Sequence, residues 1–426
     1  MTIVLFLGSL LAAMAIGFPI AYALLASGVA LMWQQDLFDA QILAQNVING
    51  ADSFPLLAVP FFMLAGEIMN VGGLSRRIVH LALTLVGHWR GGLGFVTIVA
   101  ACLLAALSGS AVADTAALAA LLLPMMRRAG HDPARAGGLI AAAGIIAPVI
   151  PPSIGFVMFG VAANVSISKL FLAGIVPGLM LAVAIAIAWA WVVRREDVVP
   201  PPRASWAERG QALRDAVWAL VLPVVVVGGL KAGVFTPTEA AVVAAVYALA
   251  VSLLVYRELR VHQLYAVFAS AARTTAIIMF LVAAAMVSAW LITVADIPGQ
   301  MIGLLQPLMD RPVLLMAAIQ LLIVAVGTAM DMAPTILILA PVLMPVVKAA
   351  GIDPVYFGVL FVMNTAIGLI TPPVGTVLNT VAGVGKLKFD AVTRGVLPFL
   401  TAQMLVLVLL VAFPALVTVP AQWLTR

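Results

Sequence analysis

Charged residues, cysteine and histidine are scarce in this 426-residue sequence. Asp, Glu, Lys and Arg make up only 9% of it, against about a quarter in soluble proteins, whereas 64% is hydrophobic. The single cysteine, Cys102, has no partner for an internal disulfide, and the four histidines do not cluster with it as transition-metal ligands would. This composition excludes an ordinary soluble domain and predicts an integral membrane protein with several apolar spans.

Motifs for several enzyme and binding classes are also missing. Neither the zinc-binding H-E-x-x-H pattern nor the ATP-binding G-x-x-x-x-G-K-[ST] loop occurs. The serine elbow of intramembrane rhomboid proteases needs a glycine where Ala106 stands, and no histidine lies on a later apolar span to activate Ser108. The net charge of +5 comes from basic residues in short loops between spans, where they set orientation. We therefore expect neither an enzyme nor a nucleic-acid-binding protein.

What the sequence does contain is an internal repeat. Residues 123–133 (LPMMRRAGHDP) align without gaps with residues 344–354 (MPVVKAAGIDP), 221 positions later. The same offset carries the Pro-Pro pair at 151–152 onto the pair at 372–373. Shared proline, glycine and aspartate positions do not follow from apolar composition alone, so the chain contains two copies of one unit.

Each copy combines two kinds of broken helix. Residues 92–126 and 312–347 are apolar stretches interrupted by glycine and a hydroxyl residue, and at ~1.5 Å per residue each half is too short to cross a ~30 Å hydrocarbon core. They are predicted to be re-entrant helical hairpins. The Pro-Pro pairs then break transmembrane helices predicted over residues 135–165 and 355–384. Because irregular backbone at membrane depth must be buried or line a cavity, each hairpin tip should meet a broken helix and share a ligand with it.

Positive charges predict the orientation of these units. One alternation of spans places seventeen of the 22 basic residues on one side, which is then the cytoplasm, and leaves Lys169, Lys231, Arg311, Lys348 and Arg426 outside. The two hairpins then enter from opposite faces, and inverted repeats with discontinuous helices are typical of secondary transporters. The expected units are N-terminal scaffold helices with an interfacial arm (1–91), a first repeat core (92–193), a cytoplasmic connector (194–215), second scaffold helices with an arm (216–311), and a second repeat core with a C-terminal helix (312–426).

Oxygen ligands are available at both breaks. Hydroxyl and carbonyl oxygens are hard ligands that suit Na⁺, and half-helix ends offer carbonyls to cations and N–H groups to anions. Asp114 and Asp331 follow the two hairpin tips. Each carboxylate could ligate a cation, support another ligand or cap its helix, and an ionisable residue at this depth is a functional candidate.

Several longer motifs resemble a known family. They are SFPLLAVPFFMLAGEIMNVGGLSRRIV (53–79), SGSAVADTAAL (108–118) and TPPVGT (371–376), and they are similar to the large membrane subunit, DctM type, of tripartite ATP-independent periplasmic (TRAP) transporters. The resemblance implies an elevator-type secondary transporter of the ion-transporter superfamily, a multi-pass protein of a bacterial inner membrane. A Na⁺ gradient would drive import of an organic acid such as a dicarboxylate or sialic acid, with no organic cofactor.

The resemblance also implies partners and sites. The partners would be a small four-helix membrane subunit and a periplasmic substrate-binding protein. A stand-alone ion or organic-anion carrier of the same superfamily stays an alternative, whereas a non-transporting scaffold would have no need of paired broken helices. The implied Na⁺ ligands are Ser108, Gly109, Ser110, Pro151, Pro152 and Ser153 at the first site and Gly327, Thr328, Asp331, Thr371, Pro372 and Gly375 at the second. The carboxylate substrate would lie between the two tips, near Asn364, Thr376 or Asn379.

Overall fold

Helices are the only regular elements in residues 2–196, 198 and 200–425, which the computed structural model describes. In this part of the chain seven helices are long and apolar enough to cross a membrane, and shorter apolar helices lie between them. The predicted all-α polytopic membrane class is therefore confirmed.

The α-helices of the described chain divide evenly between its two halves, and short η elements lie among them. The first half contains α1 (Thr2–Ala15), α2 (Ile20–Gln34), α3 (Ala40–Ala51), η1 (Phe54–Leu57), α4 (Ala58–Val71), α5 (Leu74–Val86), α6 (Gly92–Ser108), α7 (Ala111–Arg128), α8 (Pro133–Gly144), α9 (Ile154–Ala163), α10 (Ile167–Val192) and η2 (Val193–Arg195). The second half contains α11 (Trp206–Lys231), α12 (Pro237–Ala250), η3 (Val251–Val255), α13 (Val261–Val294), α14 (Ile297–Met309), α15 (Pro312–Gly327), α16 (Met332–Ala349), α17 (Pro354–Gly368), α18 (Thr376–Gly385), α19 (Phe389–Ala412) and α20 (Ala415–Thr425).

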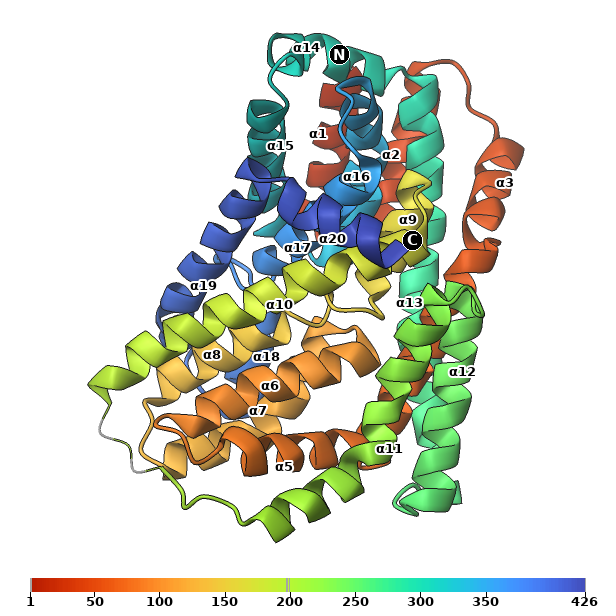
Figure 1. Cartoon of the computed structure of the whole chain (residues 1–426). Helices are drawn as coiled ribbons and strands as arrows, with labels where there is room; N and C mark the ends of the chain where they lie inside the picture. Colours follow the sequence, from red (N-terminus) through yellow and green to blue (C-terminus); the bar gives the residue numbers. More distant parts are fainter. Residues whose placement is uncertain (1, 197, 199, 426) are drawn as a thin grey trace.

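The same order of elements occurs in both halves. An arm helix, a hairpin, a broken helix and a long helix follow one another as α5, α6–α7, α8–α9 and α10, and again as α14, α15–α16, α17–α18 and α19. Figure 1 shows α5 at the lower end of the molecule and α14 at the upper end. Equivalent arms at opposite ends are the arrangement that inverted repeats predict.

Local sequence explains where the broken helices begin. The Asp-Pro pairs that align in the repeat start α8 and α17, and proline at the first helical position lacks an N–H that would have no partner there. The Asp132 side chain accepts a hydrogen bond from the N–H of Ala134 at 3.1 Å, and that of Asp353 accepts one from Tyr356 at 2.8 Å. These N-caps fix the two helices at equivalent positions in the repeat.

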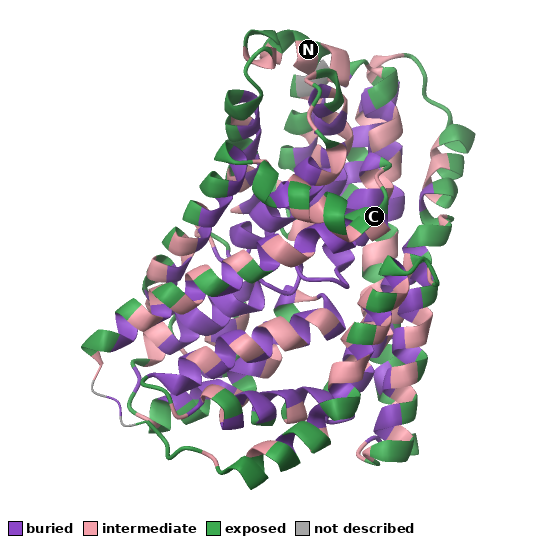
Figure 2. Cartoon of the chain, in the orientation of Figure 1, coloured by how far each residue is buried: buried purple, intermediate pink, exposed green. Residues whose placement is uncertain are grey.

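The two broken helices lie at the centre of the protein. Every residue from Ala136 to Gly144 in α8 and from Tyr356 to Gly368 in α17 is buried, and Figure 2 shows buried residues gathered in this region. Helices that are apolar on all sides are those that other helices surround. By contrast, α11 and α13 expose apolar side chains such as Val224 and Ile277, as expected for surfaces that face lipid.

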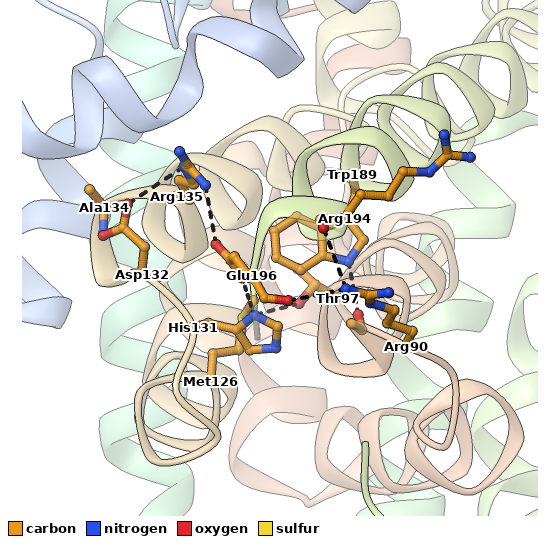
Figure 3. Close-up of polar contacts among 11 residues, drawn as sticks. Arg90, Thr97, Met126, His131, Asp132, Ala134, Arg135, Trp189, Arg194 and Glu196 are labelled. Carbon is orange, nitrogen blue, oxygen red and sulfur yellow. Dashed lines mark hydrogen bonds and ion pairs between the residues drawn. The ribbon is translucent and has the colours of Figure 1, made fainter. Parts of the chain in front are cut away.

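The start of the predicted connector is held against the first repeat, as Figure 3 shows. The carboxylate of Glu196 lies 2.6 Å from Nδ1 of buried His131 and 3.7 Å from the guanidinium of Arg135. Arg90 donates to the carbonyl of Arg194 at 3.4 Å. These contacts anchor the start of the connector to the first repeat. The last part of the predicted connector (194–215) is helical, because α11 begins at Trp206.

Candidate functional site at the broken helices

The first hairpin tip lies against the break between α8 and α9. Gly109, between α6 and α7, has a left-handed φ of 63°. A Cβ atom on Gly109 would lie closer than 3.0 Å to the Pro152 carbonyl oxygen and 3.1 Å from Cα of Ser153. Both the turn and this close approach therefore require glycine. The structure thus brings the predicted tip residues into contact with the predicted break.

Polar groups at this tip bond to one another. The Ser108 hydroxyl donates to Asp114 Oδ1 at 2.5 Å and accepts from the Ser110 N–H at 3.2 Å. Ser110 caps α7, its Oγ accepting from the Ala113 N–H at 3.4 Å. The second carboxylate oxygen, Asp114 Oδ2, is buried and has no hydrogen-bond partner among the described residues. Because burying an unpartnered carboxylate oxygen is costly, a bound cation or a proton would stabilise this tip.

Ser153 supports the irregular segment of the first break. Pro152 has no N–H to donate to the Pro148 carbonyl four residues earlier, and the Ser153 hydroxyl donates to that carbonyl instead. Its Oγ also accepts from the Phe156 N–H at 3.2 Å, which caps α9. Pro151 and Pro152 are joined by a cis peptide bond and contribute only carbonyl oxygens. The six residues predicted for the first site therefore gather around one contact between tip and break.

The second hairpin tip lies against the break between α17 and α18. Gly327 is the last residue of α15, and its carbonyl lies close to α17. A Cβ on Gly368 of α17 would lie only 2.8 Å from the Gly327 carbonyl oxygen. The N–H of Val374 donates to the Thr328 carbonyl at 3.4 Å. Contact between a tip and a break is thus repeated in the second half of the chain.

The side chains of the second site are more open than those of the first. Thr376 donates to Asp331 Oδ1 at 3.4 Å and so joins α18 to the hairpin. The hydroxyls of Thr328 and Thr371 donate to carbonyls of the preceding turn, each at 2.8 Å, and keep oxygen lone pairs free to bind a ligand. Asp331 is exposed, whereas Ser153 at the first site is fully buried. A ligand could therefore reach the second site more directly.

The irregular segment before α18 contains the other two residues predicted for this site. Pro372 is joined to Pro373 by a cis peptide bond, and Gly375 has a left-handed φ of 51° immediately before the helix. The amide of Asn379 donates to the Val374 carbonyl at 2.8 Å. The break is thus tied to the first turn of α18, whose N-terminal N–H groups have no partners within the helix.

The three residues predicted near the substrate lie in two places. Thr376 and Asn379 lie in the first turns of α18, where Asn379 is exposed. Asn364 is fully buried between α17 and α15, where its Nδ2 donates to the backbone and side-chain oxygens of Gln320 at 2.7 Å each. Gln320 was not singled out from the sequence, although an isolated amide in an apolar span indicates a buried partner.

A scaffold helix also reaches the first tip, which the sequence did not indicate. A Cβ on Gly66 of α4 would lie 3.4 Å from Cβ of Ser108. The next residue, Glu67, accepts a hydrogen bond from Ser270 of α13 at 3.0 Å, so its carboxylate is used between two scaffold helices. A small residue at this point lets the scaffold and hairpin backbones approach each other.

The atoms that could ligate a metal at both breaks suit Na⁺ better than a transition metal. The side chains there offer hydroxyl and carboxylate oxygens beside main-chain carbonyls, and within the described ranges no three His, Cys, Asp or Glu residues cluster as metal ligands. At the first tip a cation would also neutralise the unpartnered oxygen of Asp114. The residues that could hold Na⁺ there are therefore those predicted from the sequence, with Asp114 added.

Comparison with known proteins identifies relatives along the whole chain. The family model described as "Tripartite ATP-independent periplasmic transporter, DctM component" matches residues 7–416. The chain is 55% identical over 424 residues to the 2,3-diketo-L-gulonate TRAP transporter large permease protein YiaN of Escherichia coli, covering all of both chains. It is 39% identical over 398 residues to the sialic acid large permease protein SiaM of Vibrio cholerae, covering 93% of each. The C4-dicarboxylate large permease protein DctM of Pseudomonas aeruginosa is 37% identical over 382 residues, with 90% of each covered.

A solved structure has a similar fold. The YdaH transporter of Alcanivorax borkumensis superposes with a TM-score of 0.64, covering 88% of this chain and 89% of its own. Only 16% of the residues are identical, so this likeness concerns the arrangement of helices alone.

Proposed function

Because this chain belongs to the DctM family of TRAP transporters, we propose that it carries an organic acid across the membrane together with Na⁺, after a periplasmic binding protein has delivered the acid. Membership itself makes the chain a large permease subunit in a bacterial inner membrane. Coupling to Na⁺, delivery by a soluble partner, assembly with a small four-helix membrane subunit and elevator movement are the further parts of the proposal. A stand-alone carrier of the same superfamily is the competing function.

The unpartnered carboxylate oxygen of Asp114 is the observation that carries Na⁺ coupling. It belongs to a buried carboxylate that accepts from the Ser108 hydroxyl, at the tip where Gly109 lies against the Pro152 carbonyl. Positive charge from a transported ion would stabilise this carboxylate, and would leave when the ion does. Asp331 supplies the equivalent charge at the second break, where Thr376 links it to α18. An ion there would hold the second tip and α18 together next to the proposed substrate position.

For the substrate we propose a sugar-derived carboxylate. The three relatives are named for diketogulonate, sialic acid and C4-dicarboxylates, all of which carry a carboxylate. The N-terminal end of α18 suits such a group, because unpaired N–H groups and the helix dipole favour negative charge. Thr376 and Asn379 on that helix offer hydroxyl and amide groups to sugar hydroxyls. We take 2,3-diketo-L-gulonate as the first candidate because its named transporter is 55% identical.

Contacts between the halves support movement of the hairpins and broken helices as one body. Arg127 at the end of the first hairpin donates to the Gly385 carbonyl at the end of α18, at 2.5 Å. α8 packs on α19, where a Cβ on Gly138 would clash with the backbone of Gly395. Elements of both repeats are thus packed together directly, and an elevator movement would carry both ion sites at once.

Reconstitution of the complete system tests this function. Proteoliposomes that contain the chain and the small subunit, with loaded binding protein outside, should take up radiolabelled diketogulonate when Na⁺ is high outside. Replacing Na⁺ with choline, or omitting either partner, should abolish uptake. Sodium-driven uptake by the chain alone would instead establish the stand-alone carrier. If the complete system fails with diketogulonate but transports another organic acid, only the proposed substrate is wrong.

A further inference from the structure

A cavity of about 530 Å³ lies away from both ion sites, at the end of the molecule that the charge distribution assigns to the cytoplasm. It is an open hollow bordered by α5, the ends of α6 and α7 and the segment that precedes α11, all at the lower end of Figure 1. Its polar lining includes His80, Thr84, His88 and Arg128. The mechanism proposed above uses none of these residues.

Nitrogen donors beside this cavity have no acceptors. In the described part of the chain, Nε and Nη2 of Arg209 are buried without a hydrogen-bond partner, although the guanidinium lies over the Trp206 ring at 5.3 Å. Nδ1 of His88 is also without a partner, and it donates in the tautomer that carries its proton there. Burial, together with the nearby guanidinium groups of Arg209 and Arg203, lowers the pKa of His88. None of Arg128, Arg203 and Arg209 forms an ion pair with a described acidic residue. Since buried polar groups are nearly always paired, these donors indicate a missing acceptor.

Described acidic residues near the cavity are engaged elsewhere. Glu196 is held by His131 and Arg135, and Glu208 accepts from the N–H of Ser205 at 2.6 Å at the start of α11. Neither carboxylate forms an ion pair with Arg128, Arg203 or Arg209 in the described part of the chain. The cavity presents positive charge and hydrogen-bond donors, which together suit an anion with several oxygens.

The setting of α5 indicates what anion this is. The helix is amphipathic, with Leu74, Ile78 and Ala82 buried and Arg76 and His80 exposed. Its apolar face packs on α6 and α11, so its exposed basic face lies at the end of the molecule where the charge distribution places the headgroups of the cytoplasmic leaflet. Anionic phospholipids of the cytoplasmic leaflet attract basic side chains at this depth.

We propose that this cavity binds a phosphate group, either on the headgroup of an anionic phospholipid or as free phosphate. The guanidinium groups of Arg128 and Arg209 would donate charge-assisted hydrogen bonds to its oxygens, and His88 would add a neutral one. The loop between α5 and α6 contains Gly87 and Gly91 and forms the joint between arm and hairpin. A phosphate bound beside this joint would brace the arm against the end of α7.

Binding can be measured without any transport assay. The purified, delipidated chain would be titrated with phosphatidylglycerol or phosphatidylcholine and the bound lipids counted by native mass spectrometry. In parallel, its melting temperature would be followed in inorganic phosphate or chloride at equal ionic strength. We expect retention of phosphatidylglycerol over phosphatidylcholine, and an Arg128→Gln/Arg209→Gln variant should bind about tenfold more weakly or worse.

A matched variant separates this site from general loss of charge. Arg273 and Arg394 are exposed and make no ion pair or side-chain hydrogen bond in the same described ranges, so Arg273→Gln/Arg394→Gln changes the net charge equally. It should bind like the wild type. Stabilisation by inorganic phosphate that depends on Arg128 and Arg209, without lipid selectivity, would identify free phosphate as the ligand. Equal lipid and phosphate responses in both double variants would overturn the proposal.

Discussion

Replacement of Gly109 by alanine tests whether contact between the first tip and the break forms an ion site. The glycine has a left-handed φ of 63°, and its missing side chain leaves room for the Pro152 carbonyl. Gly130 is a matched control, because its φ of 88° is also left-handed but a Cβ there would meet nothing within 4 Å. Both substitutions strain the backbone, and only Gly109→Ala forces the tip and the break apart.

The structure sets the size of the expected effect. The left-handed conformation should cost each variant about 1–2 kcal/mol of stability. In Gly109→Ala the new Cβ, placed closer than 3.0 Å to the Pro152 oxygen, must also retreat by about 1 Å to reach ordinary van der Waals contact. Binding groups need to be held within about 0.5 Å of their working positions. We therefore expect Na⁺ affinity to fall by about tenfold or more, or at least ~1.4 kcal/mol, in this variant alone.

Thermal unfolding measures this difference without a substrate. A ligand that binds the folded state stabilises it by RT ln(1 + [L]/Kd), so the rise in melting temperature in a titration of NaCl against choline chloride at constant ionic strength reports the affinity. Gly130→Ala should start from a lower melting temperature yet show the wild-type response to Na⁺. Gly109→Ala should need about tenfold more Na⁺ for the same shift. The same Na⁺ response in both variants would refute a sodium site at this contact.

Three further predictions concern orientation, the second site and packing. In a Cys102→Ser background, a cysteine in place of Lys348 should react with an impermeant thiol reagent added outside, and one in place of Lys386 should not; the reverse pattern would invert the proposed topology. Thr328→Ala should raise the Na⁺ concentration for half-maximal uptake in the complete transporter, and unchanged dependence would exclude this hydroxyl as a ligand. Gln320→Leu removes the side-chain acceptor of the buried Asn364 amide and keeps only the backbone one, so it should lower the free energy of unfolding by about 1–3 kcal/mol, which denaturation in detergent would measure.

Features with a local cause were accessible from the sequence. The two Pro-Pro pairs and the glycines at the hairpin tips stand where helices end, and an Asp-Pro pair caps the helix that follows, so the repeated positions of these residues indicated equivalent breaks in the two halves. The same stretches of sequence contain the hydroxyl and carboxylate residues of the hairpin tips. The proposed ion ligands could therefore be named, although their role in binding Na⁺ stays a prediction.

Contacts between distant segments were not accessible in this way. No local pattern indicates that Gly66 of the scaffold meets Ser108, or that Gln320 accepts both hydrogen bonds from Asn364. Asn364 was grouped with Thr376 by proximity in sequence, and the tertiary packing of α17 against α15 places its amide in a buried contact instead. Pairings of this kind depend on how helices from different parts of the chain are arranged, which a single sequence does not record.

The packing of each repeat against the other has a consequence for the origin of the chain. Neither half buries its own broken helix alone, because α7 packs on α18, α8 packs on α19, and Arg127 bonds to the carbonyl of Gly385. Two separate copies of one ancestral unit, inserted in opposite directions, could make the same contacts as a homodimer. Such a unit would need nearly balanced positive charge on its two sides, so that it could insert both ways. Fusion of two such genes would remove that constraint and let each half acquire a charge bias of its own.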